Sequence, residues 1–94
     1  MAFVLNVTLP EVEYRGMQSG TSRESNRPWM SLVFEDKDTN QISVSVPADL
    51  QGDVYSLQLR KGDYCAISIR AVARADGNSY VQLTALPELL EDDD

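Results

Sequence analysis

The strongest constraint on the fold of this chain is a repeated alternation of apolar and polar residues, which is typical of strands with one buried face. Residues 2–9 begin the pattern and place four apolar side chains on one face: Phe3, Leu5, Val7 and Leu9. The same period recurs in four further segments: 29–36, 41–46, 64–73 and 80–86. The alternation therefore predicts five short strands.

The segments between these strands indicate how the strands are arranged. Residues 16–28 are rich in Gly, Ser and Pro, which is typical of a long mobile loop or of the tip of an extended hairpin. Residues 48–59 have no clear period, and we expect a helical turn followed by an extended Val54–Leu59. An open sheet of five short strands would leave its edges exposed. We therefore predict an all-β fold, a small five-stranded Greek-key barrel of the oligonucleotide-binding (OB) type with an extended hairpin wing.

The length of 94 residues accommodates one domain. Apolar residues make up 43% of the chain, too large a share for a disordered protein. We assign residues 1–87 to a single OB-like barrel that ends at Pro87. We expect residues 88–94 to be a disordered acidic tail, because five of these seven residues are carboxylates: Glu88, Glu91, Asp92, Asp93 and Asp94.

The composition excludes several classes of function. The chain has no His, and Cys65 is its only cysteine, so one chain offers no internal disulfide, no Cys/His zinc site and no Ser–His or Cys–His nucleophile pair. We expect a protein that is not an enzyme and that has no cofactor and no metal. The remaining enzymatic alternative is a metal bound by Asp36 and Asp38, although an Asp-rich segment is usually only a turn.

The sequence also bears on location. No apolar run reaches the roughly 18 residues that a membrane-spanning helix requires. The N-terminal segment, up to Glu13, contains no Lys or Arg, unlike a signal peptide. We therefore expect a cytoplasmic protein without membrane contact.

The formal net charge of −7 hides an uneven distribution. Residues 15–27 carry three arginines against Glu24, and residues 60–74 carry four Lys or Arg against Asp63. An acidic total ordinarily argues against nucleic-acid binding. The two basic stretches weaken that objection.

The segment Ser19–Leu32 combines cations with an aromatic side chain, because Arg23 and Arg27 precede Trp29 among small polar residues. Proteins that bind single-stranded nucleic acid use cations to follow the phosphates and aromatic planes to stack on unpaired bases. The alternative is structural: Trp29 would pack in the core, and the two arginines would be ordinary solvated surface.

This segment resembles the DNA-binding wing of the filamentous-phage gene-five proteins, a family of single-stranded DNA-binding (helix-destabilising) proteins. The resemblance rests on three matches in order: Gly20–Arg23, Pro28–Trp29 and Ser31–Leu32. Three more follow downstream: Lys61–Tyr64, Asp76–Gly77 and Leu86–Pro87. The chain departs from the family in two residues inserted around Asn26–Arg27 and in its acidic end.

The resemblance implies a barrel of OB topology and a symmetric homodimer built largely through the last hairpin. It also implies cooperative coating of single-stranded DNA in phage or mobile-element replication, with Arg23 on a phosphate and Trp29 on a base. From the basic stretches we predict further phosphate contacts by four arginines: Arg15, Arg27, Arg70 and Arg74. Tyr64 and Tyr80 could face the DNA, but we expect them in the dimer interface, where tyrosine is enriched.

Two questions about partners stay open at this point. The acidic tail is either a solvated end or a segment that competes with DNA for the arginines or recruits a replication protein. The alternative to a DNA-binding protein is an acidic small β-barrel protein-interaction module without nucleic-acid binding, which would use an exposed strand edge.

Overall fold

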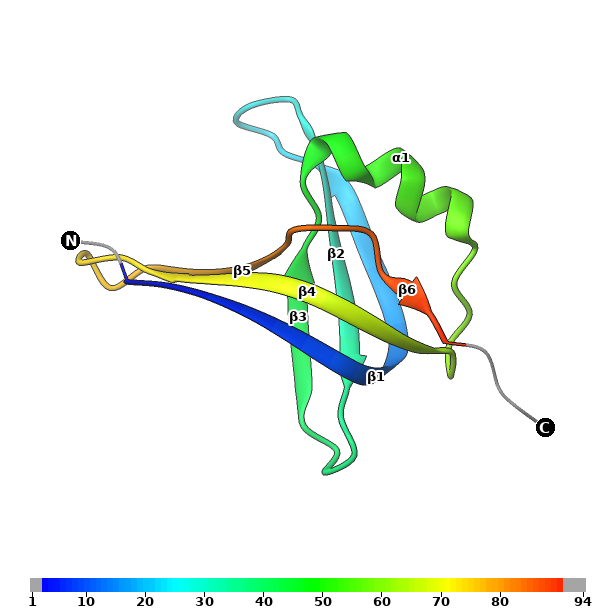
Figure 1. The fold of residues 1–94 in the computed structure, drawn as a ribbon. Helices are drawn as coiled ribbons and strands as arrows, with labels where there is room; N and C mark the ends of the chain where they lie inside the picture. Colours follow the sequence, from blue (N-terminus) through cyan, green and yellow to red (C-terminus); the bar gives the residue numbers. More distant parts are fainter. Residues whose placement is uncertain (1–2, 91–94) are drawn as a thin grey trace.

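The computed structural model describes residues 3–90. Figure 1 shows a barrel of strands with one helix beside it and hairpins that project from it. The elements are, in chain order, β1 (Phe3–Thr21), β2 (Pro28–Glu35), β3 (Gln41–Ser45), α1 (Ala48–Leu57), β4 (Tyr64–Ala73), β5 (Ser79–Leu83) and β6 (Glu88–Leu89). Five strands close the barrel in the order β1-β2-β3-β5-β4, because β4 pairs again with β1. The predicted five-stranded all-β barrel is confirmed.

Strand β1 closes the barrel because it pairs with two partners. Residues 3–13 pair antiparallel with β4, and residues 13–21 pair antiparallel with β2. Two irregularities in register let the strand bend between these partners, one beside Pro10 and one beside Gly16. Proline fits the first of them because it has no N–H to donate to the ladder. The strand therefore runs past Pro10, as the alternating pattern through Tyr14 suggested.

The core consists of the alternating residues that the sequence places inward. Phe34 and Leu32 have no exposed surface, and the ring of Tyr14 meets that of Phe34 edge-on with centroids 5.9 Å apart. The inward faces of β2, β3 and β4 add Met30, Val44, Cys65, Ile67 and Ile69. Burial raises the pKa of the Cys65 thiol to about 11, so this cysteine acts as a small packing residue.

The segment after β3 differs from the prediction. α1 is a helix of ten residues, and the expected extended Val54–Leu59 is wrong. Three apolar residues recur at helical spacing, Leu50, Val54 and Leu57, of which Val54 is buried in the core and Leu50 packs against it. So short an apolar set does not stand out from the polar residues around it. In the described part of the chain no helix is long and apolar enough to cross a membrane.

Besides the β2–β3 turn, two further hairpins extend beyond the barrel (Figure 1). The first, which we call the wing, comprises residues 17–30 at the end of β1 and the start of β2. The second, which we call the arm, comprises the start of β1 (3–5), the end of β4, the turn 74–78 and the start of β5. Of the two interpretations of residues 16–28, the hairpin tip is the one observed, since the amide of Ser22 donates a 2.8 Å hydrogen bond to the carbonyl of Arg27.

The end of the domain also differs from the prediction. β6 pairs with the start of β4, and the amide of Leu90 donates a 2.9 Å hydrogen bond to the carbonyl of Tyr64. Paired structure thus continues past the predicted boundary at Pro87. The remainder of the predicted acidic tail, residues 91–94, lies outside the described residues.

Replacing Phe34 by Ala should lower the free energy of unfolding by about 3–5 kcal/mol, because a fully buried ring leaves a cavity. Urea denaturation followed by circular dichroism measures the loss. The matched control is Phe3→Ala, since Phe3 is 71% exposed and its removal should cost less than about 1 kcal/mol. Equal losses in the two variants would contradict this assignment of the core.

Candidate nucleic-acid interface

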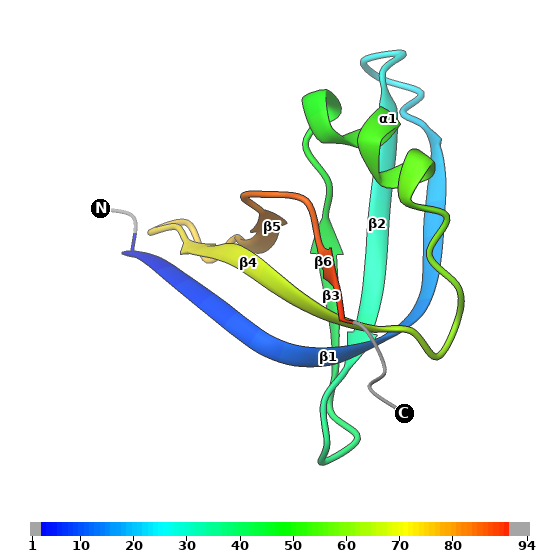
Figure 2. The same cartoon turned by 45° about the vertical axis from the view of Figure 1, so that its right-hand side comes forward.

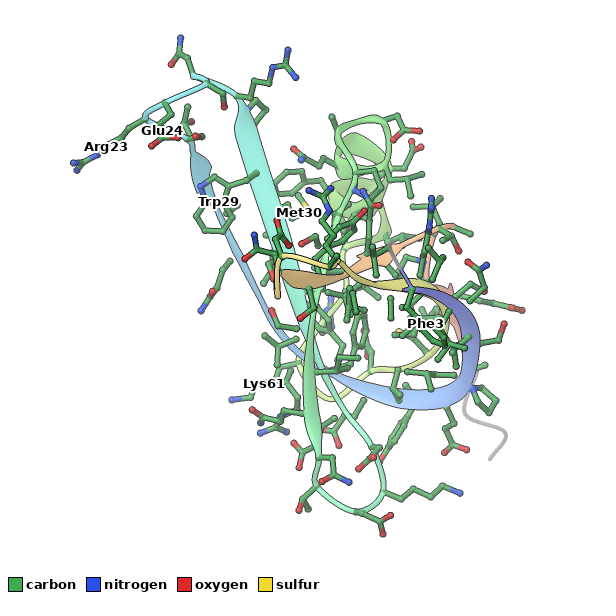
Figure 3. The ribbon with its side chains drawn as sticks, turned by 90° about the vertical axis from the view of Figure 1, so that its left-hand side faces the viewer. Phe3, Arg23, Glu24, Trp29, Met30 and Lys61 are labelled. Carbon is green, nitrogen blue, oxygen red and sulfur yellow. The ribbon has the colours of Figure 1, made fainter. Side chains whose placement is uncertain are left out.

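Trp29 lies on the outer face of the wing and not in the barrel core. β2 alternates so that Met30, 3% exposed, faces inward, whereas Trp29 is 44% exposed (Figure 3). The cross-strand partner of Trp29 is Gly20, and a Cβ atom built on Gly20 would lie 3.0 Å from the indole ring. The ring therefore rests on the backbone of β1, which fixes its position and leaves much of its surface open to solvent.

The helix supports the wing from its inner side (Figure 2). The Nε2 atom of Gln51 donates hydrogen bonds to the carbonyls of Pro28 at 3.4 Å and Val46 at 3.3 Å. The hydroxyl of Tyr55 donates to Oγ of Ser19 at 3.4 Å. These contacts reach both strands of the wing, so its base is held from one side while the face that carries the indole is left open.

The two arginines of the wing lie in its tip and are exposed. Arg23 points away from the hairpin, and Glu24 follows it in the turn (Figure 3). The ion pairs found within residues 3–90 all involve Arg15. Neither Arg23 nor Arg27 is therefore paired with a carboxylate in the described part of the chain, and both charges are available to an anion.

Arg15 is placed differently from the arginines of the tip. Its guanidinium group lies 2.6 Å from a carboxylate oxygen of Glu13 and 3.3 Å from one of Glu35. The hydrogen bond to Glu13 raises the pKa of Arg15 above its ordinary value. Because two carboxylates compensate this charge, the surroundings of Arg15 do not favour the phosphate contact predicted for it.

Below Trp29, and as far as Val33, the outer face of β2 and β3 carries small uncharged side chains. The hydroxyls of Ser31 and Ser43 lie 2.8 Å apart and form a hydrogen bond. Ser45 and Val33 complete this surface, which we call the serine face. Such a face offers hydroxyl groups, and its small side chains leave room for an extended polymer to lie across it.

The arm supplies a second set of cations. The guanidinium carbon of Arg74 lies 5.6 Å from the centroid of the Tyr80 ring, a cation–π contact. Arg70 is exposed and pairs in register with Gln82, two residues from Tyr80 on the same face. The carboxylate of Asp76 accepts hydrogen bonds from Asn78 within the turn. The arm therefore presents two arginines beside one aromatic ring.

The two tyrosines predicted for a dimer interface lie far apart on one protomer. Tyr64 is the first residue of β4, whereas Tyr80 pairs with Val72 near the end of that strand. Eight residues of extended strand correspond to about 27 Å. The structure therefore does not bring Tyr64 and Tyr80 into one compact patch.

Carboxylates gather at the end of the barrel opposite the wing. A hollow there has one lysine, Lys37, and four carboxylates among its lining residues: Glu11, Glu13, Glu35 and Asp36. By contrast, the wing tip has a single carboxylate, Glu24, and the arm, as the structure describes it, also has one, Asp76. The chain therefore has an acidic end, whereas Arg23 and Arg27 project from the wing and Arg70 and Arg74 lie on the arm. Arg60, which is also exposed, lies between α1 and β4.

Asp36 and Asp38, the residues of the alternative metal site, form a turn. A carboxylate oxygen of Asp36 accepts hydrogen bonds from the amides of Asp38 and Asn40, both at 2.9 Å. These bonds hold the pKa of Asp36 below its ordinary value. Within residues 3–90, no three His, Cys, Asp or Glu side chains are grouped so that they could hold a metal ion.

Comparison with known proteins bears on the fold. The sequence matches no known family and no curated protein. Among solved structures, Rim1, a mitochondrial single-stranded DNA binding protein from S. cerevisiae, superposes with a TM-score of 0.54 and 17% sequence identity, over 95% of this chain and 96% of that one. The chain has the oligonucleotide-binding fold. In this fold the second and third strands, with the loops that flank them, form the usual ligand face.

Two parts of this site are not evident from the sequence. Gly20 stands in a stretch whose glycine and serine content indicates only flexibility, and its contact with Trp29 depends on the register of the hairpin. The support from Gln51 and Tyr55 depends on α1, whose full length the pattern does not predict. A glycine placed to face an aromatic residue across a short turn is the one signal that could have indicated the contact.

Replacing Gly20 by Val should displace the indole, because the new side chain would occupy the position of the ring. The emission maximum of Trp29 should move to longer wavelength, and acrylamide should quench it more strongly. The backbone at Gly20 is not left-handed, so the fold should tolerate the change. The control is Gly52→Ala, since a Cβ at Gly52 meets nothing within 4 Å. An unchanged spectrum for Gly20→Val would contradict the contact.

Proposed function

We propose that this protein is a non-enzymatic single-stranded DNA-binding protein that coats unpaired strands with little sequence preference. One observation carries the proposal: the indole of Trp29 is held on Gly20 in an exposed position, on the hairpin whose tip carries Arg23 and Arg27. The ligand face typical of the OB fold corresponds here to the serine face between the wing and the arm. The likeness to a protein described as a mitochondrial single-stranded DNA binding protein supports the same assignment.

Binding would depend on stacking and on phosphate neutralisation. Every base has a π face, so stacking on Trp29 would discriminate little among sequences. Since Gly20 already fixes the ring, little rotamer freedom would be lost when a base stacks on it. Arg23 and Arg27 at one end of the path, and Arg70 and Arg74 at the other, would contact phosphates.

The net charge of −7 does not oppose this proposal as strongly as its size suggests. Salt screens exposed charges over about 8 Å at physiological ionic strength. The carboxylate cluster lies at the opposite end of the barrel from the wing, since Glu13 pairs with Glu35 at the far end of the β1–β2 ladder. A strand that follows the serine face would therefore meet the arginines at close range and this carboxylate cluster only at a distance, although Glu24 lies beside Arg23 in the wing tip.

We extend the proposal to a gene-five-like protein of a phage or mobile element, which would act as a homodimer in the host cytoplasm during DNA replication. The order of the wing and hairpin motifs supports this finer class. Tyr80, beside Arg74, is better placed to face DNA than to join a dimer contact. Tyr64, 48% exposed, remains the candidate for the dimer interface.

The acidic tail would act as a regulator that competes with DNA for the arginines or recruits a replication protein.

The second candidate function is a protein-interaction module without nucleic-acid binding. The single-sided pairing of β1 over residues 3–9 favours that alternative, because within the described structure only β4 pairs with this stretch. Removal of residues 91–94 should strengthen DNA binding under the first proposal. Under the second, neither the full chain nor the truncated one should bind DNA.

Binding to poly-dT should weaken steeply with salt. If Arg23, Arg27, Arg70 and Arg74 each neutralise one phosphate, the slope of log K against log salt should be about −3 per protomer, since each contact on a single strand contributes about −0.7. Titration of a fluorescently labelled oligonucleotide at several salt concentrations measures this slope.

The matched variants Arg23→Ala and Lys37→Ala locate the phosphate path. Arg23→Ala should make the slope shallower by about 0.7. Lys37→Ala removes an equal charge from the acidic end and should leave the slope unchanged. No binding at low salt, or a flat response of the wild-type protein, would remove the proposal.

Trp29→Ala should weaken oligo-dT binding by about fivefold or more, because stacking contributes about 1–3 kcal/mol per base. Trp29→Phe retains an aromatic plane and should lose less. Anisotropy of a labelled oligonucleotide measures both. Thermal denaturation is the control, since a half-exposed side chain should alter stability little. A large loss of stability together with unchanged binding would assign Trp29 a structural role only.

A further inference from the structure

The arm contains an apolar trough that the proposed function does not use. On one face of the arm, the middle strand β4 contributes only Ala71 and Ala73. The flanking strands β1 and β5 contribute three larger side chains to the same face: Phe3, Leu5 and Val81. Together with Ser43 these residues line a hollow of about 460 Å³. This volume is typical of sites for small organic ligands.

The aromatic wall of the trough is unusually exposed. Phe3 is 71% exposed and Leu5 is 51% exposed, and residues 3–9 contain no charged side chain. Apolar side chains grouped on the surface of a small domain commonly mark a binding surface. The narrow floor of alanines between taller walls suits a flat ligand better than a bulky side chain.

The trough is continuous with the proposed DNA path. Ser43 lines the trough and is hydrogen-bonded to Ser31 on the serine face, two residues from Trp29 on β2. Figure 3 shows Trp29 and Phe3 from the same side of the molecule. A strand that stacks on Trp29 and crosses the serine face would therefore reach the trough next.

In the described part of the chain, the lining of the trough is uncharged, which does not oppose a nucleotide. None of the residues that line it is a carboxylate, in a chain with 15 Asp and Glu. Tyr80 also lines the trough, but its ring, with Arg74 over it, lies on the opposite face of the arm from Ala71 and Val81. A base bound between the alanine floor and Phe3 would meet an uncharged surface.

We propose that the trough is a second nucleobase site, in which an unpaired base lies over Ala71 and Ala73 and stacks against the ring of Phe3. This proposal rests on the proposed function, because it extends the same path from the wing to the arm. It adds a second stacking residue to that function, and it extends the path of the bound strand from the wing to the arm.

The test compares two lengths of oligo-dT, about 4 and about 16 nucleotides, which span the site sizes of one OB fold. Phe3→Ala should weaken binding of the longer oligonucleotide about tenfold and leave the shorter one, held by Trp29, unchanged. Phe3→Tyr keeps the ring and should bind as the wild type does. Phe3→Leu keeps an apolar side chain without a ring and should behave as Phe3→Ala.

The outcomes separate the two proposals. If Trp29→Ala weakens binding but no Phe3 variant does, the trough proposal is overturned and the proposed function stands. If the wild-type protein binds neither oligonucleotide, both are overturned. Wild-type affinity of Phe3→Leu for the longer oligonucleotide would overturn stacking on the ring.

A second measurement distinguishes a base from a second copy of the chain. Photocrosslinking with 5-iodouracil in the longer oligonucleotide, followed by mass spectrometry, should modify the peptide that contains Phe3. Light scattering gives the mass in solution. A lower mass for Phe3→Ala without any crosslink at Phe3 would show that another protomer covers the trough, and would overturn the proposal.

Discussion

The fold depends on the sharing of strand β1 between two partners. This strand of 19 residues pairs with β4 along its first half and with β2 along its second half. The bends near Pro10 and Gly16 let one continuous strand close the barrel. Because β1 is longer than the barrel requires, its two ends project as parts of the arm and the wing. Phe3 lies at one end and Gly20 near the other, so the proposed base sites are positioned by the same strand.

The sequence predicts the barrel well and the helix poorly, for a physical reason. In β2, Met30, Leu32 and Phe34 alternate with outward residues, so each side chain indicates its face. In α1 only Val54 is buried, and three apolar residues over two turns give a weak helical signal. β6 is equally hard to predict, because Glu88 and Leu89 pair through backbone atoms with no alternation of their own.

The candidate site was predictable in its residue types but not in its contacts. The sequence identifies Arg23, Arg27 and Trp29 because cations and an aromatic residue cluster on one segment. It does not reveal the compensation of Arg15 by Glu13 and Glu35, which depends on pairing between β1 and β2. The sequence also leads to one predicted dimer interface for Tyr64 and Tyr80, although these residues lie near opposite ends of β4. Long-range register decides these relations, and single-segment patterns contain no information about it.

The central claim, that unpaired DNA follows one face from the wing to the arm, is most directly tested by NMR chemical shifts. Titration of the isotope-labelled protein with oligo-dT should perturb the indole N–H of Trp29 and the amides of Ser31 and Ser43. The amides of Asp36 and Lys37 at the acidic end should remain unperturbed. Perturbation centred on the acidic end, or an indole resonance unchanged at saturating oligonucleotide, would contradict the account.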